Sequence, residues 1–193
     1  CKMAEEAPTL EAIRYVRGSL QLLDQLQLPF KFEYMTITNC KQTWEAIREM
    51  NVRGAPAIAI AAALGLAVEA GAKKGTMPDG QHAKDWILER LEYLKTSRPT
   101  AVNLFNDCNR LADFVRALGG EADAVLDCYI EEAEKMLAND ISDNMAIGEF
   151  GGEAVLAKAG KDKVKVLTHC NTVRVCFVLM CVCVCVCVCV RGW

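Results

Sequence analysis

One segment of this chain is apolar around its whole circumference when it is drawn as a helix. Residues 57–70 carry no charged side chain before Glu69. A helix without a polar face must be enclosed by other elements, so we predict that this segment is the central helix of a domain. Pro56 suits the first turn, where the N–H that it lacks would have no partner, and Gly71 is the expected C-terminal stop.

The residues before the central helix show the alternation of a small β unit. Strands are expected at 13–16, 19–23 and 31–37, with Arg17-Gly18 as the hairpin turn between the first two. A short helix should follow, because Asn39 precedes helical spacing and Gln42 stands three residues later, as in a capping box.

Helical spacing returns after the central helix. The expected helices cover 81–95, 101–118, 121–139 and 142–159, the last with a break near Gly151-Gly152. A short strand at 164–168 then follows a helix, as the first strand of an α/β domain would. We therefore expect a mixed chain, α+β in its first part and α/β in its second. A small N-terminal β unit plus a helical domain precedes only the first strand of a Rossmann-like α/β domain.

This interpretation divides the chain into four parts. They are a disordered N-terminus at 1–8, a β/helical domain at 9–160, the first strand of a truncated Rossmann-like domain at 161–172, and an aberrant Cys-Val tail at 173–193. The uncharged run from Val175 to Val190 has 16 residues, and a membrane helix needs roughly 17–25. Its alternation of β-branched residues favours a strand, and no histidine or turn organises its cysteines into a zinc site.

A TG dinucleotide repeat encodes alternating cysteine and valine, so our hypothesis is that a retained intron or a frameshift produced the tail. Comparison of transcript and genomic sequence tests this, and an uninterrupted coding exon across Thr172 would contradict it. The plainest interpretation of the tail is an unevolved segment that tends to aggregate.

Composition narrows the classes of function. The formal net charge is −3, with acidic and basic residues interspersed, which argues against a nucleic-acid partner. The N-terminal residues contain no apolar signal region, so a cytoplasmic location is expected, with the nucleus as a second location. Six of the eleven cysteines lie in the tail. The other five lack metal-ligand spacing and are expected to be reduced thiols.

Two places could carry chemistry. Arg53 and Gly54 stand at the start of the central helix, where unpaired N–H groups and the positive end of the dipole favour an anion or phosphate. The alternative is a tight glycine entry beside a surface arginine, and spacing alone favours it. Cys170 stands just beyond the expected strand at 164–168, where ligands of open parallel sheets bind. It could be a reactive thiol or a buried apolar cysteine, and His169 beside it is expected to be structural.

Five stretches in order along the chain resemble the methylthioribose-1-phosphate isomerase family. They are Thr9–Tyr15, Leu23–Gln25, Val52–Ile58, Ser97–Asn103 and Leu167–Thr172, the last containing Thr-His-Cys-Asn. Neighbours of this family are the regulatory subunits of the translation-initiation guanine-nucleotide exchange factor and ribose-1,5-bisphosphate isomerase. The resemblance runs from about Thr9 to Thr172.

The resemblance implies a cytosolic, commonly dimeric enzyme of methionine salvage that needs no metal or organic cofactor. It would interconvert 5-methylthioribose 1-phosphate and 5-methylthioribulose 1-phosphate, with no nucleic-acid or membrane partner. By motif, Arg53, Gly54 and Ala55 would contact the sugar phosphate, Arg98 would be a second binding arginine, and Cys170 would be the catalytic thiol or proton donor. With this resemblance the phosphate interpretation of the Arg53 segment becomes the preferred one.

The sequence departs from the family after Thr172, where the family continues with glycine and a full α/β domain. The family's catalytic aspartate has no counterpart here, so we expect this chain by itself to have little or no isomerase activity. The alternative function is a non-catalytic regulatory or interaction subunit, as in the exchange-factor relatives.

Overall fold

The computed structural model describes residues 11–160 of the 193-residue chain. The expected strand at 164–168, Cys170 and the Cys-Val tail therefore lie outside the described residues, as does the expected disordered segment at 1–8. The chain divides into two compact units, and the one that we call the first unit is Ala12–Leu137. The described part of the other consists mainly of the helix residues from Ala138 onward.

Three short strands form one antiparallel sheet in the order β1-β2-β3. They are β1 Ile13–Val16, β2 Ser19–Leu23 and β3 Tyr34–Ile37. Ile13 pairs with Leu22, and Leu22 pairs with Met35 on the other side. The hairpin turn contains Gly18 at φ 85°, a left-handed conformation that glycine adopts without steric cost. The expected three-stranded unit is confirmed, with a third strand shorter than the alternation suggested.

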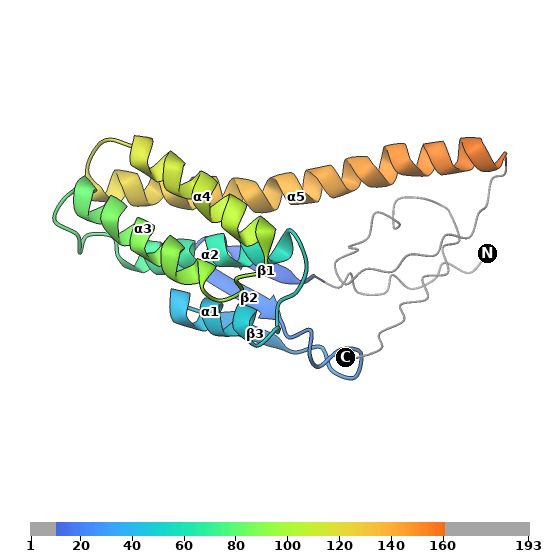
Figure 1. Cartoon of the computed structure of the whole chain (residues 1–193), viewed down its shortest axis with the longest axis horizontal. Coiled ribbons are helices and arrows are strands. Elements are labelled where there is room, and N and C mark those ends of the chain that lie inside the picture. Colours follow the sequence, from blue (N-terminus) through green and yellow to red (C-terminus); the bar gives the residue numbers. More distant parts are fainter. Residues whose placement is uncertain (1–10, 161–193) are drawn as a thin grey trace. The chain divides into compact units, whose positions relative to one another are not determined.

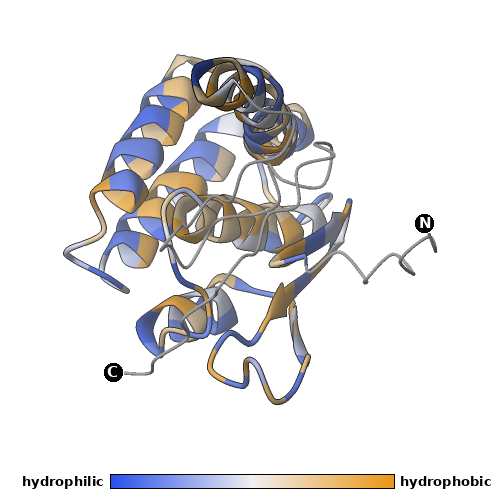
Figure 2. Cartoon of the chain, turned by 90° about the vertical axis from the view of Figure 1, so that its right-hand side faces the viewer, coloured by the Kyte–Doolittle hydropathy of each residue, from blue (hydrophilic) through white to orange (hydrophobic). Residues whose placement is uncertain are grey.

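Five helices follow the sheet in the sequence. They are α1 Cys40–Arg48, α2 Ala57–Ala72, α3 Gly80–Lys95, α4 Val102–Ala117 and α5 Ala122–Ala159. In the first unit α2 packs against α1, α3, α4, β1 and β2 (Figure 1). Twelve of its sixteen residues are buried, whereas the helices around it carry both apolar and hydrophilic residues along their length (Figure 2). The predicted central helix is therefore confirmed.

The contact between α1 and α2 is unusually close at Gly65. A Cβ atom at this position would lie 2.0 Å from Thr43 Oγ1. Thr43 is fully buried, and its hydroxyl donates to the Asn39 carbonyl at 3.0 Å. The absence of a side chain at position 65 thus lets α1 lie directly against α2.

The start of α1 is capped from two directions. Asn39 Oδ1 accepts from the Gln42 amide at 3.0 Å, and Gln42 Oε1 accepts in return from the Thr38 amide at 2.8 Å. The expected capping box is confirmed, except that its return bond goes to residue 38 rather than 39. Glu69 Oε2 of α2 accepts from the Cys40 amide at 2.5 Å. The one charged side chain of α2 therefore serves the start of another helix.

Two glycine-based expectations are wrong. Gly71 does not end α2, which continues to Ala72, and the left-handed glycine is Gly75 at φ 70°. Its amide donates to Asp123 Oδ1 at 2.9 Å, so a contact with α5 sets the position of the turn. The segments 121–139 and 142–159 form one continuous helix, and no break occurs at Gly151-Gly152. A glycine inside a helix costs only about 1 kcal/mol relative to alanine, which does not by itself interrupt the helix.

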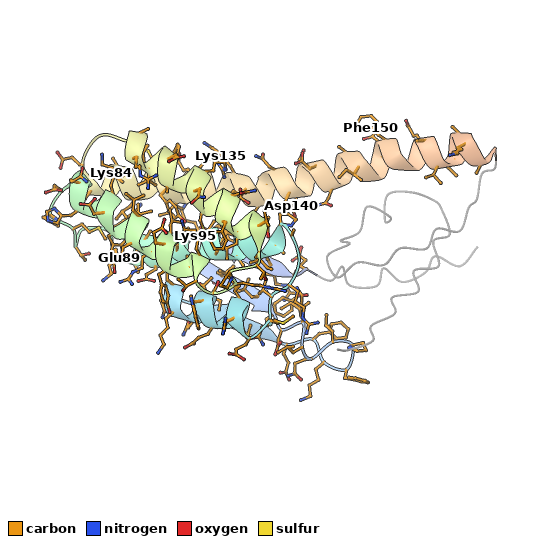
Figure 3. All side chains as sticks on the ribbon, in the orientation of Figure 1. Lys84, Glu89, Lys95, Lys135, Asp140 and Phe150 are labelled. Carbon is orange, nitrogen blue, oxygen red and sulfur yellow. The ribbon has the colours of Figure 1, made fainter. Side chains whose placement is uncertain are left out.

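Polar contacts join the outer elements of the first unit. On α3, Lys84 Nζ donates to the Leu118 carbonyl at 2.9 Å, and Lys95 Nζ donates to Asn109 Oδ1 of α4 at 3.0 Å (Figure 3). The buried hydroxyl of Tyr129 on α5 donates to the Ala63 carbonyl of α2 at 3.2 Å. These bonds join α3 to α4 and α5 to the central helix.

One carboxylate joins the hairpin to α5. Glu134 accepts from Tyr15 Oη at 2.9 Å, from Arg17 Nε at 3.0 Å and from Arg17 Nη2 at 2.6 Å. The hydrogen bond from Arg17 is the main cause that holds the pKa of Glu134 below its usual range. This bidentate pair is the principal polar contact between the sheet and α5 among the described residues.

The part of α5 that belongs to the second unit exposes large apolar side chains. They are Ile141, Met145, Ile147, Phe150 and Val155, of which Figure 3 labels Phe150, 66% exposed. Within residues 11–160 no helix has the length and apolar character that a membrane span requires.

The close contact at Gly65 generates a stability prediction. Gly65→Ala should destabilise the fold by about 1–2 kcal/mol, because overpacking against Thr43 exceeds the gain in helix propensity. Gly71→Ala is the matched control in the same helix, since its Cβ would meet nothing nearer than Ile130 Cδ1 at 4.0 Å. Urea unfolding of both variants checks this. A Gly65→Ala protein as stable as the parent would show that the helices can separate without cost.

The Glu134 contact generates a pH prediction. The pKa of Glu134 is lower in the folded chain than in the unfolded chain. The stabilisation that its charge provides is therefore complete above the unfolded carboxyl pKa of about 4.3, and it is lost as the pH falls through the folded pKa. Glu134→Gln should lower the thermal midpoint by about 2 °C at pH 7, since the pair is partly exposed and screened. The difference from the parent should close below about pH 4.

Glu89→Gln is the control for that measurement. Glu89 is exposed on α3 (Figure 3) and has no ion pair within residues 11–160. Its variant should follow the parent at every pH. A Glu134→Gln deficit that persists unchanged to pH 3 would mean that the carboxylate charge is not what stabilises the contact.

Candidate functional site

The direction of the helices brings two distant segments to one end of the first unit. Short loops join α2 to α3 and α3 to α4, and α3 and α4 both pack on α2. The starts of α2 and α4 therefore lie at the same end as the finish of α3 (Figure 1). We call this the α2/α4 end and define it as Arg53–Pro56 together with Arg98–Asn103.

The start of α2 is formed by a glycine and a proline. Pro56 occupies the N-cap position, and no side chain caps the helix. Gly54 has φ 93°, and its carbonyl accepts from the Ile58 amide at 3.0 Å. A side chain at position 54 would be strained in this conformation, so glycine is needed for this entry. The entry leaves Ala55 exposed at the surface.

Arg53 is held by its own loop. Its Nε donates to the Met50 carbonyl at 3.0 Å, which fixes the plane of the guanidinium group. Within residues 11–160 the two terminal nitrogens of Arg53 have no hydrogen-bond or ion-pair partner. An arginine oriented through Nε keeps its remaining donors available for a bidentate contact with an anion.

The second segment begins α4 and contains two unsatisfied donors. The Ala101 amide donates to the Arg98 carbonyl at 3.0 Å, and Ala101 then stands at the N-cap without a side-chain bond. Arg98 Nη1 and Asn103 Nδ2 are both buried without a partner in the part of the chain that the structure describes. Buried donors are nearly always paired in native proteins, so two such atoms around the start of one helix require an explanation.

Contacts with α1 hold this second segment in place. Trp44 Nε1 donates to Thr96 Oγ1 at 2.8 Å, and the Trp44 ring stacks on Tyr93 with centroids 5.9 Å apart. The buried hydroxyl of Ser97 donates to the Leu94 carbonyl at 2.6 Å. Since α1 also leads into the Arg53 loop, the same helix supports both segments.

These features together suit an anion. The structure shows side-chain caps at α1, from Asn39, and at α3, from Asp79, but none at α2 or α4. Both helix starts carry partial positive charge, and Arg53 and Arg98 add full positive charge. At α2 the amides of Ile58, Ala59 and Ile60 already donate to the Gly54 and Pro56 carbonyls, so its first turn contributes the helix dipole rather than unpaired N–H groups. The α2/α4 end can therefore bind a phosphate or a similar oxyanion.

Other chemistry has less support within residues 11–160. No group of three or more His, Cys, Asp or Glu side chains there could hold a metal ion. Burial is the main cause that raises the pKa of the Cys40 thiol far above its usual range and that of Cys108 to about 12. A thiol with so high a pKa is not a nucleophile at neutral pH.

The structure thus brings together four of the five site residues expected from the sequence. Arg53, Gly54, Ala55 and Arg98 share the α2/α4 end, and their roles stay predictions. Cys170 lies outside the described residues. Sequence reasoning did not single out Asn103, because only the packing around α4 reveals that its amide has no partner.

Comparison with known proteins identifies similar chains. Methylthioribose-1-phosphate isomerase of Fusarium vanettenii is 46% identical over 169 residues, which are 85% of this chain and 44% of that protein. The protein of the same name from Ricinus communis is 46% identical over 168 residues, again 85% of this chain and 44% of the relative. This chain therefore spans less than half the length of these relatives.

Two solved structures resemble the fold. The 5-methylthioribose 1-phosphate isomerase from Pyrococcus horikoshii aligns with a TM-score of 0.73 at 32% identity, over 86% of this chain and 44% of that one. The translation initiation factor eIF-2B, subunit delta, from A. fulgidus aligns with a TM-score of 0.72 at 34% identity, over 86% and 46%. Both support the mixed arrangement of a small antiparallel sheet and helices.

A comparison with models of protein families matches residues 51–183, a segment that includes both parts of the α2/α4 end. This match covers well over half of the chain and agrees with the similar sequences and structures. The chain therefore belongs to the Initiation factor 2 subunit family.

Proposed function

We propose that this chain carries the phosphate-binding part of an isomerase of methionine salvage that converts 5-methylthioribose 1-phosphate to 5-methylthioribulose 1-phosphate. The observation that supports this most directly is the pair of buried, unpaired donors around the uncapped start of α4, at the same end of the helices as Arg53. The names of the isomerase relatives support the choice of a sugar phosphate over other anions.

The proposed reaction is an internal redox change that needs no external oxidant. Carbon 2 of the aldose loses its hydrogen and its hydroxyl proton and becomes a carbonyl. The bond between carbon 1 and the ring oxygen breaks, so that carbon 1 gains a hydrogen and the former ring oxygen gains a proton. A phosphate held by Arg53, Gly54, Ala55 and Arg98 would fix carbon 1 in position, because two arginines can hold several of its oxygens at once. Cys170 would be the thiol that assists proton transfer.

Binding and turnover are separable in this proposal. The chain spans about 44% of the length of the isomerase relatives, and the family's catalytic aspartate is expected beyond the matched part. We propose that the chain as given binds the sugar phosphate with little or no turnover. A homodimer, a cytoplasmic location and the first strand of a Rossmann-like domain at 161–172 belong to the same proposal.

A non-catalytic regulatory subunit is the second candidate. It is supported by the likeness to the eIF-2B delta structure, whose TM-score of 0.72 nearly equals that of the isomerase. The two candidates differ in one measurable property. An isomerase fragment should recognise 5-methylthioribose 1-phosphate, whereas a purely regulatory subunit has no need to.

Removal of either arginine should weaken binding of the sugar phosphate. We expect Arg53→Ala and Arg98→Ala each to weaken it about 10- to 100-fold, because each deletes charge-assisted hydrogen bonds to the phosphate. Isothermal titration of the full chain with 5-methylthioribose 1-phosphate is the measurement.

Arg116→Ala is the matched control, because Arg116 lies in the last turn of α4 and pairs with Asp113. It removes the same charge far along the helix from the α2/α4 end and should leave the affinity unchanged. A parent chain that binds no sugar phosphate would favour the regulatory candidate. Equal affinities for the parent and both arginine variants would place the phosphate elsewhere.

A further inference from the structure

We propose that Asn103 is a further ligand-contacting residue of the α2/α4 end, with its side-chain amide donating to an oxygen of the bound sugar phosphate. This inference rests on the proposed function and adds a residue to it. It is carried by Asn103 Nδ2 and Arg98 Nη1, two buried donors without partners among the described residues, which lie on either side of the N-cap of α4.

The position of Asn103 in α4 is not one from which its side chain caps the helix. Ala101 is the N-cap and Val102 the first helical residue, so Asn103 is second in the helix. At α1 and α3 an asparagine or aspartate at the N-cap itself accepts from the amide three residues later. Asn103 does not cap α4, because it stands two positions too late to do so.

The side-chain amides of other asparagines in the described chain donate to acceptors within the fold. Asn51 Nδ2 donates to Asp24 Oδ1 at 2.8 Å, and Asn144 Nδ2 donates to the Asp140 carbonyl at 2.7 Å. Asn39 Nδ2 donates to Thr38 Oγ1 at 3.3 Å. Asn103 Nδ2 is instead buried without an acceptor. Since burial of an unpaired amide destabilises a fold, packing alone would favour an apolar residue at this position.

Arg98 Nη1 also lacks a partner and belongs to the loop that leads into α4. The bond from the Ala101 amide to the Arg98 carbonyl closes a turn, so the two side chains leave a short, fixed piece of backbone. Both unsatisfied atoms are nitrogens that only donate, and one belongs to a cation. The ligand they require presents acceptor oxygens and negative charge, which describes a sugar phosphate.

Among the described residues, the third buried side-chain nitrogen without a partner is Arg90 Nε, which lies outside the α2/α4 end. Arg90 Nε lies in the middle of α3, and its guanidinium group stands over the Trp86 ring at 5.8 Å. Its charge acts on Cys40 at the start of α1, near Glu69 at the finish of α2. Arg90 therefore lies toward the opposite end of α2 and has an aromatic contact.

The test separates binding from folding. Asn103→Asp keeps the shape of the side chain, removes both donors and adds a negative charge at a helix start, where such a charge stabilises. We expect sugar-phosphate binding to weaken more than tenfold while the thermal midpoint without ligand stays equal or rises. Asn103→Leu, which removes the donors without adding charge, should weaken binding about three- to tenfold.

Asn106→Asp is the matched control. Asn106 is exposed one turn further along α4 and receives the same change of charge. At 0.15 M salt, where the screening length is about 8 Å, its variant should bind within about twofold of the parent. Asn103 variants that bind like the parent, or that lose thermal stability in step with affinity, would overturn the proposal and assign Asn103 a structural role.

Inorganic phosphate distinguishes this inference from the proposed function. If the parent binds no sugar phosphate but is stabilised thermally by phosphate, and Asn103→Asp loses that stabilisation, Asn103 contacts an anion although the isomerase assignment fails. If neither compound binds the parent, both the inference and the proposed function are wrong. If sugar phosphate binds and only the arginine variants weaken it, the proposed function survives without Asn103.

Discussion

Enclosure of α2 is the constraint on which the first unit depends. A helix with twelve buried residues has no solvent-exposed face, so the sheet and the helices α1, α3 and α4 surround it. Small side chains make this possible at short range, most clearly where Gly65 lies against Thr43. Other features of the unit follow from this arrangement, including the use of Glu69 to cap α1 across the contact.

The same enclosure creates the candidate site. Neighbours cover the sides of α2, and the alternating directions of α2, α3 and α4 bring the start of α4 to the same end as the start of α2. Both starts lack side-chain caps, and both are preceded by an arginine. Partial charges of two helices and the charges of Arg53 and Arg98 therefore favour an anion at the α2/α4 end. The unpaired donors show that this end is not optimised for the stability of the chain alone.

Sequence patterns predicted most elements, because apolar spacing reports which face each element buries. The hairpin at Gly18, the cap at Asn39 and the apolar helix after Pro56 all follow from local rules that packing did not override. The errors came from glycines interpreted as breaks. Gly71 and Gly151 lie within helices, because one glycine costs little compared with the hydrogen bonds that continue on either side. The turn after α2 is set by local bonds to the Ala70 and Lys73 carbonyls and by the bond between Gly75 and Asp123.

By itself the sequence determined that an apolar helix must be central, and that Arg53 and Gly54 stand at its entry. Those conclusions need only periodicity, the dipole of a helix and the conformational freedom of glycine. Local patterns did not bring Arg98 to the same end as Arg53, which only the family resemblance suggested and the tertiary structure shows. The tertiary structure alone decided that the Asn103 amide is buried without an acceptor. Proximity across 45 residues depends on helix directions, and hydrogen-bond satisfaction depends on every neighbour of an atom, so neither can be inferred from local spacing.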